Sequence, residues 1–302
     1  MKQCDESCVL AIDAGGTFFK SMLISKNGEG LRESYYTLRV NSDGPAEQIL
    51  AAYKNIVDYE AGFARKAGLV LDSVAVATPG PFDYKEGISL MTHKFKSIYG
   101  YNLKKELRLY SNCNNISFMH DVLAFLAGEV YIGSGKGYDR IAAIVIGTGV
   151  AMACMINGQL LKNDAGGSAV SIFSRKVHDG VTEDYVSKRG IINLYDKFYM
   201  GDKAEIANIE VKDIAQKARE QKDEAAIKAF YEAGYTLGLV LNPIVDEYDL
   251  QCLIFGGQIS NSLDLMMDGL LKGLSEDSRI QEIIMGKNIE TSTLIGSAIQ
   301  NL

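Results

Sequence analysis

The sequence contains the same short pattern twice, and each copy consists of an apolar strand, a glycine turn and a second apolar strand. The copies span Cys8–Ser25 and Ile141–Ile156. Each is followed by segments whose apolar residues recur at helical spacing. The two copies share little sequence, so any duplication is one of structure. A strand–turn–strand unit that returns with its helices predicts two α/β domains packed around a cleft.

Length, charge and hydrophobicity argue against a membrane-spanning, secreted or nucleic-acid-binding protein. The 302 residues suffice for two modest domains with one core each, and 47% hydrophobic residues are ordinary for a globular chain. A net charge of −7 argues against a mainly electrostatic nucleic-acid partner. No apolar run is long enough to span a membrane, and the polar start of the chain does not resemble a signal peptide. We therefore expect a cytoplasmic protein without a membrane or nucleic-acid partner.

The cysteines do not suggest a disulfide framework. There are five of them, an odd number, and they are scattered at positions 4, 8, 113, 154 and 252. Cys4 and Cys8 lie four residues apart, but no second pair or nearby histidine completes a zinc site. Reduced thiols are the expectation.

The first glycine turn has the composition of a phosphate-binding loop. Gly15 and Gly16 let the backbone approach a phosphate, and Thr17 adds a hydroxyl donor. Asp13, at the end of the strand, is placed to hold Mg²⁺ through water, and Lys20 can offset phosphate charge. An ordinary β-hairpin turn with an acidic residue nearby is the alternative.

Two further glycine turns follow apolar strands. Gly147, Thr148 and Gly149 form a weak pattern alone, but paired with the first turn they could grip a polyphosphate from the opposite side. Gly256 and Gly257 open a helix and suit close approach to an adenosine or its α-phosphate. As a lone strand-to-helix turn this third motif would be unremarkable.

The order of these motifs resembles that of the ROK (repressor, open reading frame, kinase) family of sugar kinases, which belongs to the hexokinase, Hsp70 and actin superfamily. The resemblance covers nearly the whole chain and includes a closing helix over Thr291–Leu302. It implies an α/β fold of two actin-like (ribonuclease H-like) ATPase domains around an interdomain cleft. Residues 1–120 would form a smaller N-terminal domain, which the helix 289–302 rejoins, and residues 121–288 a larger C-terminal domain.

The resemblance also implies a glucokinase-like ATP:sugar phosphotransferase that uses ATP and Mg²⁺ and forms a homodimer. Asp121 stands where the family has the base that accepts the proton of the attacking sugar hydroxyl. An aspartate before a helix is also a common N-cap, and both roles can hold together. Gly80 belongs to a loop that resembles the one facing the sugar in the family; a plain turn is compatible with it too. A hexose, an N-acetylhexosamine or a related sugar is the expected substrate.

Several residues at the positions that bind the sugar in the family differ from the family pattern. His120 replaces an asparagine; it either contacts the sugar or serves as a partly buried structural histidine. By hand alignment, Gly167 takes the place of a sugar-binding glutamate and Val170 that of a histidine. Losing one such buried hydrogen bond to the sugar typically lowers the binding free energy by about 1–3 kcal/mol. Ala151 replaces a glycine after the second turn.

The cysteine-rich zinc motif of the family is also missing. Its ligand positions correspond to Ser174, Lys176 and Val181, so we predict no structural zinc site. Glu183 matches a second glutamate that contacts the sugar in the family; a surface acidic residue on a helix is the alternative.

Two other functions fit the same scaffold. Loss of the sugar-reading residues suggests a non-catalytic sensor of sugar or nucleotide as the alternative to an enzyme. A transcriptional repressor of this family would carry an N-terminal helix-turn-helix, and the first strand begins by Cys8, which leaves no room for one.

Overall fold

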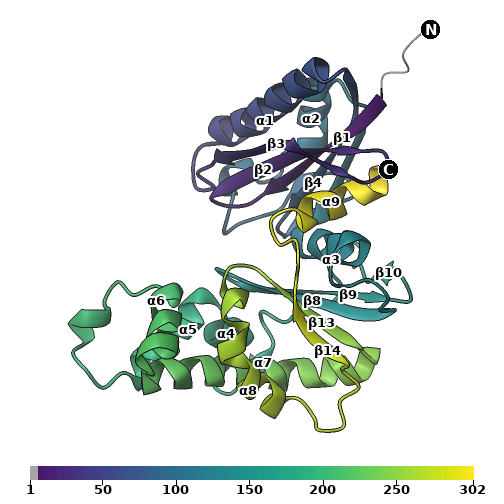
Figure 1. Cartoon of the computed structure of the whole chain (residues 1–302). Coiled ribbons are helices and arrows are strands. Elements are labelled where there is room, and N and C mark those ends of the chain that lie inside the picture. Colours follow the sequence, from purple (N-terminus) through teal and green to yellow (C-terminus); the bar gives the residue numbers. More distant parts are fainter. Residues whose placement is uncertain (1–5) are drawn as a thin grey trace. The chain divides into compact units, whose positions relative to one another are not determined.

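The computed structural model describes residues 6–302, which form two compact units (Figure 1). The first unit contains the chain up to residue 136 together with residues 162–169 and 288–302. The second unit contains residues 137–161 and 170–287. Each unit is built on one five-stranded sheet, in the order β3-β2-β1-β4-β7 in the first and β10-β9-β8-β13-β14 in the second.

The sheet of the first unit begins with the first copy of the strand–turn–strand pattern. Its strands are β1 (Glu6–Ala14), β2 (Phe18–Ser25), β3 (Gly30–Arg39), β4 (Leu69–Thr78) and β7 (Asn115–His120). The first three form an antiparallel meander, and β4 and β7 run parallel to β1. A two-stranded ribbon, β5 (Phe82–Asp83) and β6 (Ile88–Ser89), and a short turn of helix η1 (Lys96–Ile98) follow β4.

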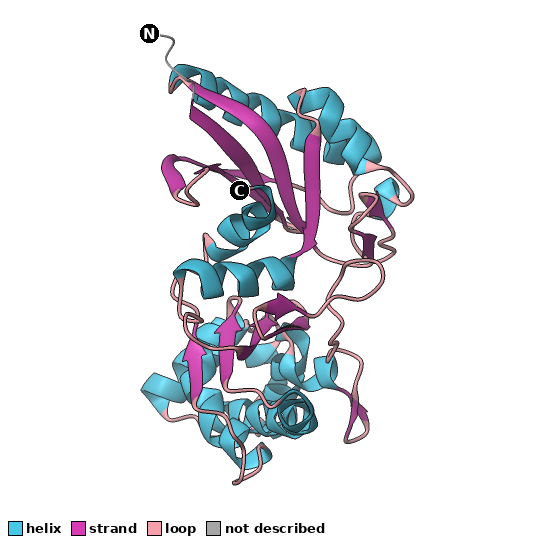
Figure 2. Cartoon of the chain, turned by 90° about the vertical axis from the view of Figure 1, so that its right-hand side faces the viewer, coloured by secondary structure: helices cyan, strands magenta, loops and turns pink. Residues whose placement is uncertain are grey.

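Helices cover both faces of this sheet (Figure 2). Because side chains alternate along a strand, β1 sends Leu10 and Ile12 into a core with α1 and α2, and Val9 and Ala11 into a core with α9. The helices are α1 (Ala46–Lys66), α2 (Leu103–Ser111), α3 (Asp121–Ile132) and α9 (Ser292–Ala298), with η5 (Ile299–Asn301) after the last. A strand buried on both faces explains the continuous apolar run at the start of the chain.

The sheet of the second unit begins with the second copy of the pattern. Its strands are β8 (Arg140–Ile146), β9 (Val150–Ile156), β10 (Gln159–Leu160), β13 (Cys252–Gly256) and β14 (Glu282–Met285). Again the first three are antiparallel, and the last two run parallel to the first. The expectation of two α/β units of similar design is confirmed.

The helices of the second unit surround the long α7 (Glu224–Tyr248), whose apolar face forms the centre of the core. Gly234 and Gly238 of α7 lie directly against α8 (Leu263–Gly273); a Cβ atom at Gly234 would lie 2.1 Å from the carbonyl oxygen of Met266. The other short elements are β11 (Lys176–Val177), β12 (Gly180–Val181), α4 (Thr182–Val186), α5 (Lys188–Phe198), η2 (Lys203–Ile206), α6 (Val211–Gln216), η3 (Lys217–Gln221) and η4 (Ile259–Ser262).

Helix α3 belongs to the first unit because it crosses α9 in close contact. A Cβ atom at Gly296 would lie 1.8 Å from the carbonyl oxygen of Ala124, and one at Gly128 would lie 2.0 Å from that of Ser292. The buried carboxylate of Glu129 accepts a hydrogen bond of 2.6 Å from the Ser292 hydroxyl. The sequence expectation ended the N-terminal domain at residue 120, whereas this packing continues the first unit to residue 136.

Two expectations from composition concern the whole chain. Within residues 6–302, no helix combines the length and apolar character that crossing a bilayer requires. Cys8, Cys113, Cys154 and Cys252 are buried free thiols, and Cys4 lies outside the described residues.

Candidate active site

Three predicted motifs of the first unit meet at one edge of its sheet. Strands β1, β4 and β7 are parallel, so their carboxyl ends lie side by side. The register pairs Asp13 with Ala77, and Thr78 with His120. The first glycine turn, the loop after Thr78 and the pair His120–Asp121 therefore share this edge, which is where α/β folds place their ligands.

The first glycine turn leaves its backbone donors free. A Cβ atom at Gly15 would lie 2.8 Å from the carbonyl oxygen of Phe18, so the tight turn requires a glycine there. No acceptor in the described chain binds the amides of Gly15, Gly16 or Thr17, although the carbonyl oxygens of Gly16 and Thr17 are hydrogen-bonded. Such a row of free amides suits an anion such as phosphate.

Two carboxylates lie close together at this edge. Burial, and to a lesser degree the negative charge of Asp121, raise the pKa of Asp13 to about 7, while Lys20 acts in the opposite direction. Lys20 is the direct cross-strand partner of Asp13 in the β1–β2 register. Two carboxylates opposed by one lysine leave negative charge uncompensated, and a hard cation would relieve it.

The residues present fit Mg²⁺ only as a water- and phosphate-coordinated ion. Within residues 6–302, no cluster of three or more His, Cys, Asp and Glu side chains is arranged to hold a metal. Mg²⁺ commonly retains waters and binds through one or two carboxylates plus substrate phosphates, and Asp13 with Asp121 nearby meets that requirement.

Asp121 is the first residue of α3, and one of its two carboxylate oxygens has a hydrogen-bond donor while the other has none within residues 6–302. Its Oδ1 atom accepts a hydrogen bond of 2.7 Å from the amide of Val122 and lies 3.5 Å from Nε2 of His120. No donor within residues 6–302 binds Oδ2. The side chain is 40% exposed, so this oxygen can reach a ligand. A capping contact and a free basic oxygen therefore coexist.

His120 is held by a neighbouring loop. Its Nδ1 atom accepts a hydrogen bond of 3.3 Å from the amide of Ser168, so in the neutral ring the proton is on Nε2. The ring centroid lies 5.6 Å from that of Tyr84, and a Cβ atom at Gly80 would lie 3.9 Å from Nε2. His120 thus presents an N–H group toward Gly80 and Asp121.

Tyr84 is a site residue that sequence reasoning missed. It is buried, its hydroxyl donates to the carbonyl oxygen of Thr78 (3.1 Å), and both burial and the charge of Asp121 raise its pKa. Gly167 packs on it: a Cβ atom at Gly167 would lie 3.2 Å from Cε2 of Tyr84. The position aligned with the family's glutamate is therefore occupied on one side by an aromatic ring. An aromatic residue shortly after Pro79-Gly80-Pro81 was the only signal in the sequence.

The second unit brings its own two glycine turns together. Strands β8 and β13 are parallel neighbours, and Gly256 pairs with Val145 in their register. Gly257 has a φ of +86°, and a Cβ atom there would lie 2.3 Å from the carbonyl oxygen of Ile146. Gly257 therefore packs against the end of β8, directly before the turn Gly147–Gly149.

Glu183, a further predicted sugar ligand, lies against the turn Gly147–Gly149. A Cβ atom at Gly149 would lie 2.5 Å from Oε2 of Glu183, so the carboxylate rests on the glycine. The backbone of Glu183 is fixed by a 3.1 Å hydrogen bond from its amide to the carbonyl oxygen of Phe173. The turn itself is closed by a bond of 2.9 Å from the Gly147 amide to the Gly149 carbonyl oxygen, and Thr148 lies at its tip.

The remaining departures from the family pattern lie elsewhere in the second unit. Val170 is buried in its core, and Ala151 pairs with Val145 across β8 and β9. Lys176 and Val181 pair with each other in the β11–β12 ribbon. The absence of a zinc site there stays a prediction.

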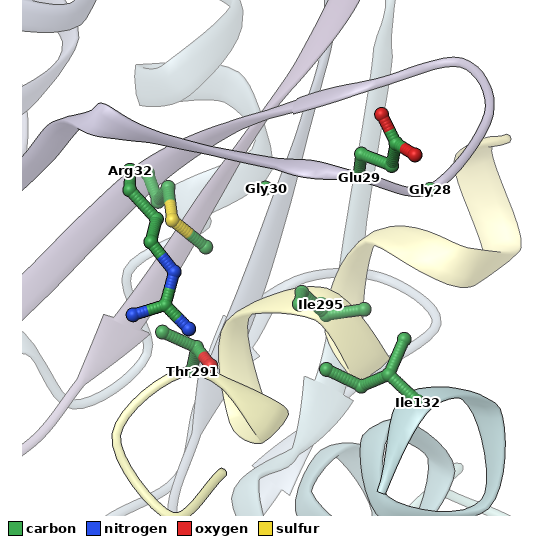
Figure 3. Close-up of a pocket in the computed structure, with 8 residues that line it drawn as sticks. Gly28, Glu29, Gly30, Arg32, Ile132, Thr291 and Ile295 are labelled. Carbon is green, nitrogen blue, oxygen red and sulfur yellow. The ribbon is translucent and has the colours of Figure 1, made fainter.

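A separate pocket in the first unit contains none of the predicted residues (Figure 3). The β2–β3 turn, the end of α3 and the first part of α9 line it, and its apolar side chains are those of Met22, Ile132 and Ile295. Arg32 and Glu29 line it from the strand side.

Comparison with curated relatives gives partial matches. The chain is 27% identical over 153 residues to a glucokinase from Thermotoga maritima, a match that covers 51% of this chain and 46% of that protein. It is 26% identical over 154 residues to a beta-glucoside kinase from Listeria monocytogenes, which covers 51% of this chain and 48% of that protein. The matched region spans about half the length of these relatives.

Comparison with solved structures and family models covers almost the whole chain. A ROK family glucokinase from Streptomyces griseus, solved with glucose and AMPPNP, has a TM-score of 0.76 at 21% identity, over 96% of this chain and 98% of that one. A ROK family transcriptional regulator, described as a homologue of the E. coli MLC protein, has a TM-score of 0.81 at 16% identity, over 97% of this chain and 77% of that one. These likenesses show the two-domain actin-like fold that the sequence predicted. The ROK family model matches residues 9–299, and the chain therefore belongs to the ROK family.

Proposed function

We propose that the protein transfers the γ-phosphoryl group of ATP to a hydroxyl group of a sugar. The observation that carries the proposal is the edge of the first sheet, where an uncommitted carboxylate oxygen of Asp121 lies near a glycine turn with free amides. The glucokinases and the beta-glucoside kinase among the relatives make a sugar kinase the activity that fits this edge best.

The roles follow from the chemistry of each group. Asp121 Oδ2 accepts the proton of the attacking hydroxyl, and the His120 Nε2–H group donates to a sugar oxygen and helps to fix the orientation of that carboxylate. The amides and hydroxyl of the first glycine turn, Gly15–Thr17, donate to the phosphoryl oxygens. Mg²⁺, held by Asp13 through water, would neutralise charge on the phosphates.

The second unit supplies the remaining groups. The turns at Gly147–Gly149 and Gly256–Gly257, which follow neighbouring parallel strands, bind the rest of the triphosphate and the adenosine, and Glu183 accepts hydrogen bonds from sugar hydroxyls. Support comes from the packing of Gly257 on Ile146, the residue before the first of these turns, and from the position of Glu183 on Gly149. Phosphoryl transfer would require both units to act on the same pair of substrates.

The sugar class is the least constrained part of the proposal. Gly80 and His120 lie side by side next to Asp121, but Gly167 and Val170 offer no acceptor where the family has a glutamate and a histidine. We infer a hexose, an N-acetylhexosamine or a related sugar that is held by fewer polar contacts on that side.

An Asp121→Asn variant tests the proposed base. The amide keeps the shape and the contact with the Val122 amide but cannot take a proton, so sugar-dependent ADP release should fall about 10²–10⁴-fold while AMPPNP still binds. A coupled assay over hexoses, N-acetylhexosamines and pentoses measures this, and Asp246→Asn on the exposed side of α7 serves as the matched control. Full activity of Asp121→Asn would remove the proposed base.

A non-catalytic sensor is the second candidate, because Tyr84 packs where the missing glutamate would project and a regulator shares the fold. A sensor should bind a sugar or a nucleotide in calorimetry and show no turnover with any sugar and Mg-ATP. Turnover that depends on Asp121 would exclude it.

A further inference from the structure

A lysine outside the recognised motifs lies on the first glycine turn. A Cβ atom at Gly16 would lie 3.6 Å from Cδ and 3.8 Å from Cε of Lys94, so the aliphatic stem of this lysine rests on the glycine. Lys94 lies between the β5–β6 ribbon and η1, nearly eighty residues after the turn in sequence. Both belong to the first unit.

The backbone around Lys94 is anchored to the turn. The amide of Phe95 donates to the carbonyl oxygen of Ser42 (2.9 Å), and the amide of Ser42 donates to that of Gly16 (3.3 Å). Phe95 has a φ of 51° and is buried, with its ring centroid 6.0 Å from that of Phe19 on β2. A left-handed, buried residue fixed by such contacts holds the preceding lysine in place.

The charge of Lys94 has no counterion in the part of the chain that the structure describes. The side chain is half-buried, yet within residues 6–302 it forms no ion pair and no hydrogen bond. Lys20, the other cation near this turn, differs because it lies opposite the carboxylate of Asp13 and lowers its pKa. Because the aliphatic stem packs on Gly16, the ammonium group at its end lies close to the turn and is free to pair with an anionic ligand.

The glycine turn that Lys94 packs on has backbone amides without hydrogen-bond acceptors among the described residues. Its three amides, from Gly15 to Thr17, also lack an acceptor in the described chain. Fixed backbone donors and an uncompensated ammonium group at one place define a site for an anion with several oxygens, and a phosphoryl group has that chemistry.

We propose that Lys94 binds the phosphoryl group at the first glycine turn and is a further substrate-contacting residue of the proposed kinase. The inference rests on the proposed function, because the phosphoryl group in question is the one that the protein would transfer from ATP. The ammonium group contacts an oxygen of that group from the side of the β6–η1 loop, while the turn amides contact it from below. Lys20 then serves mainly to balance Asp13.

The test compares Lys94→Met, which keeps the stem that packs on Gly16, with Lys96→Met, which removes an exposed lysine two residues further on. Calorimetry with Mg-AMPPNP should show about tenfold weaker binding for Lys94→Met, the size of one charge-assisted hydrogen bond, and no change for Lys96→Met. Adenosine, which has no phosphate, should bind all three proteins equally. In steady-state assays kcat/KM for ATP should fall at least tenfold in Lys94→Met only, and Lys94→Arg should recover part of it.

Three results would overturn the assignment. In the first, Lys94→Met keeps the wild-type affinity for AMPPNP and the wild-type kcat/KM for ATP. In the second, Lys94→Met loses as much affinity for adenosine as for AMPPNP. In the third, Lys96→Met loses as much affinity for AMPPNP as Lys94→Met does. Should Lys94→Met fail to give folded protein by circular dichroism, Lys94→Gln repeats the comparison. If the wild-type protein turns over a sugar and Lys94→Met does so equally well, only the role of Lys94 fails; if the wild-type protein neither binds AMPPNP nor turns over any sugar, the proposed function fails with it.

Discussion

Glu60 occupies an environment poorly suited to a charged carboxylate. It lies on α1, fully buried, and the Ser21 hydroxyl on β2 donates to its Oε1 atom at 2.6 Å. Its Oε2 atom is buried without a hydrogen-bond partner. Burial therefore raises the pKa of this carboxyl group from 4.5 to about 7, and only the Ser21 contact opposes the effect. A neutral carboxylic acid is the form that the folded protein favours.

The pH dependence of stability should reveal this proton. The folded pKa lies above the unfolded one, so the folded state retains a proton that the unfolded state releases, and stability is lost as pH rises from 4.5 to about 7. The total loss is roughly 3 kcal/mol, since a tenfold change in an equilibrium constant is about 1.4 kcal/mol. Relative to Glu60→Gln, which does not titrate, the wild-type free energy of unfolding should fall across this range and level off above it. Urea unfolding at several pH values measures the difference; parallel curves would contradict the prediction.

Gly149 and Glu183 should behave as one unit. A methyl group at Gly149 would displace the Glu183 carboxylate, so Gly149→Ala should raise the KM for the sugar about as much as Glu183→Ala does, by tenfold or more. In the Glu183→Ala background the added methyl group has nothing to displace. The double variant should therefore be no worse than Glu183→Ala alone. Strict additivity of the two effects in steady-state kinetics would show that Glu183 does not act through this contact.

At the scale of residues, sequence could predict the groups that lie within motifs and not those brought in by packing. Asp13 lies near the end of β1 and Asp121 directly follows β7, and these strands run in the same direction in one sheet, so the proximity of the two carboxylates follows from strand order. Tyr84 and Lys94 reach the same edge through loops that are fixed by contacts with distant segments, including Ala165 in one case and Ser42 in the other. The spacing of residues along the sequence does not predict such long-range contacts.

At the scale of elements, the crossing of α3 and α9 depends on two glycines. Gly296→Ala places a methyl group 1.8 Å from a backbone carbonyl oxygen, where no side chain can yield, and should lower the free energy of unfolding by about 2 kcal/mol or more. Gly62→Ala in α1 is the matched control: nothing lies within 4 Å of its Cβ position, and helix propensity should stabilise the protein by about 0.5–1 kcal/mol. Denaturant unfolding measures both, and equal effects would refute the close crossing.

The strands that flank the glycine turns were predictable because apolar runs and glycine turns are local signals, whereas the short edge strands β10 and β14 were not predicted. The grouping of α3 with the first unit was not, since it depends on a glycine-mediated contact with a helix about 170 residues later. Residues 162–169 likewise belong to the first unit, through Tyr84 and His120, although they follow a strand of the second. Tertiary packing decides such assignments and leaves no periodicity in the sequence.

At the scale of the whole molecule, the first unit is assembled from distant parts of the chain. Val9, Ala11 and Ala75 of its sheet are covered by Leu294 and Ala298 of α9. Leu294→Asp should therefore prevent folding of the first unit, whereas Gln300→Asp, at an exposed position of η5, should change stability by less than about 0.5 kcal/mol. Soluble yield and thermal melting measure this. A stable Leu294→Asp protein would mean that α9 is dispensable.

The contact between Gly257 and the carbonyl oxygen of Ile146 ties two loops that the chain encodes more than a hundred residues apart. Neither loop can change its path without displacing the other, since the space between them does not admit even one extra carbon atom. Substitutions in these two stretches should consequently be tolerated only as matched sets. Grafting one loop from a relative would succeed when its counterpart is transplanted as well.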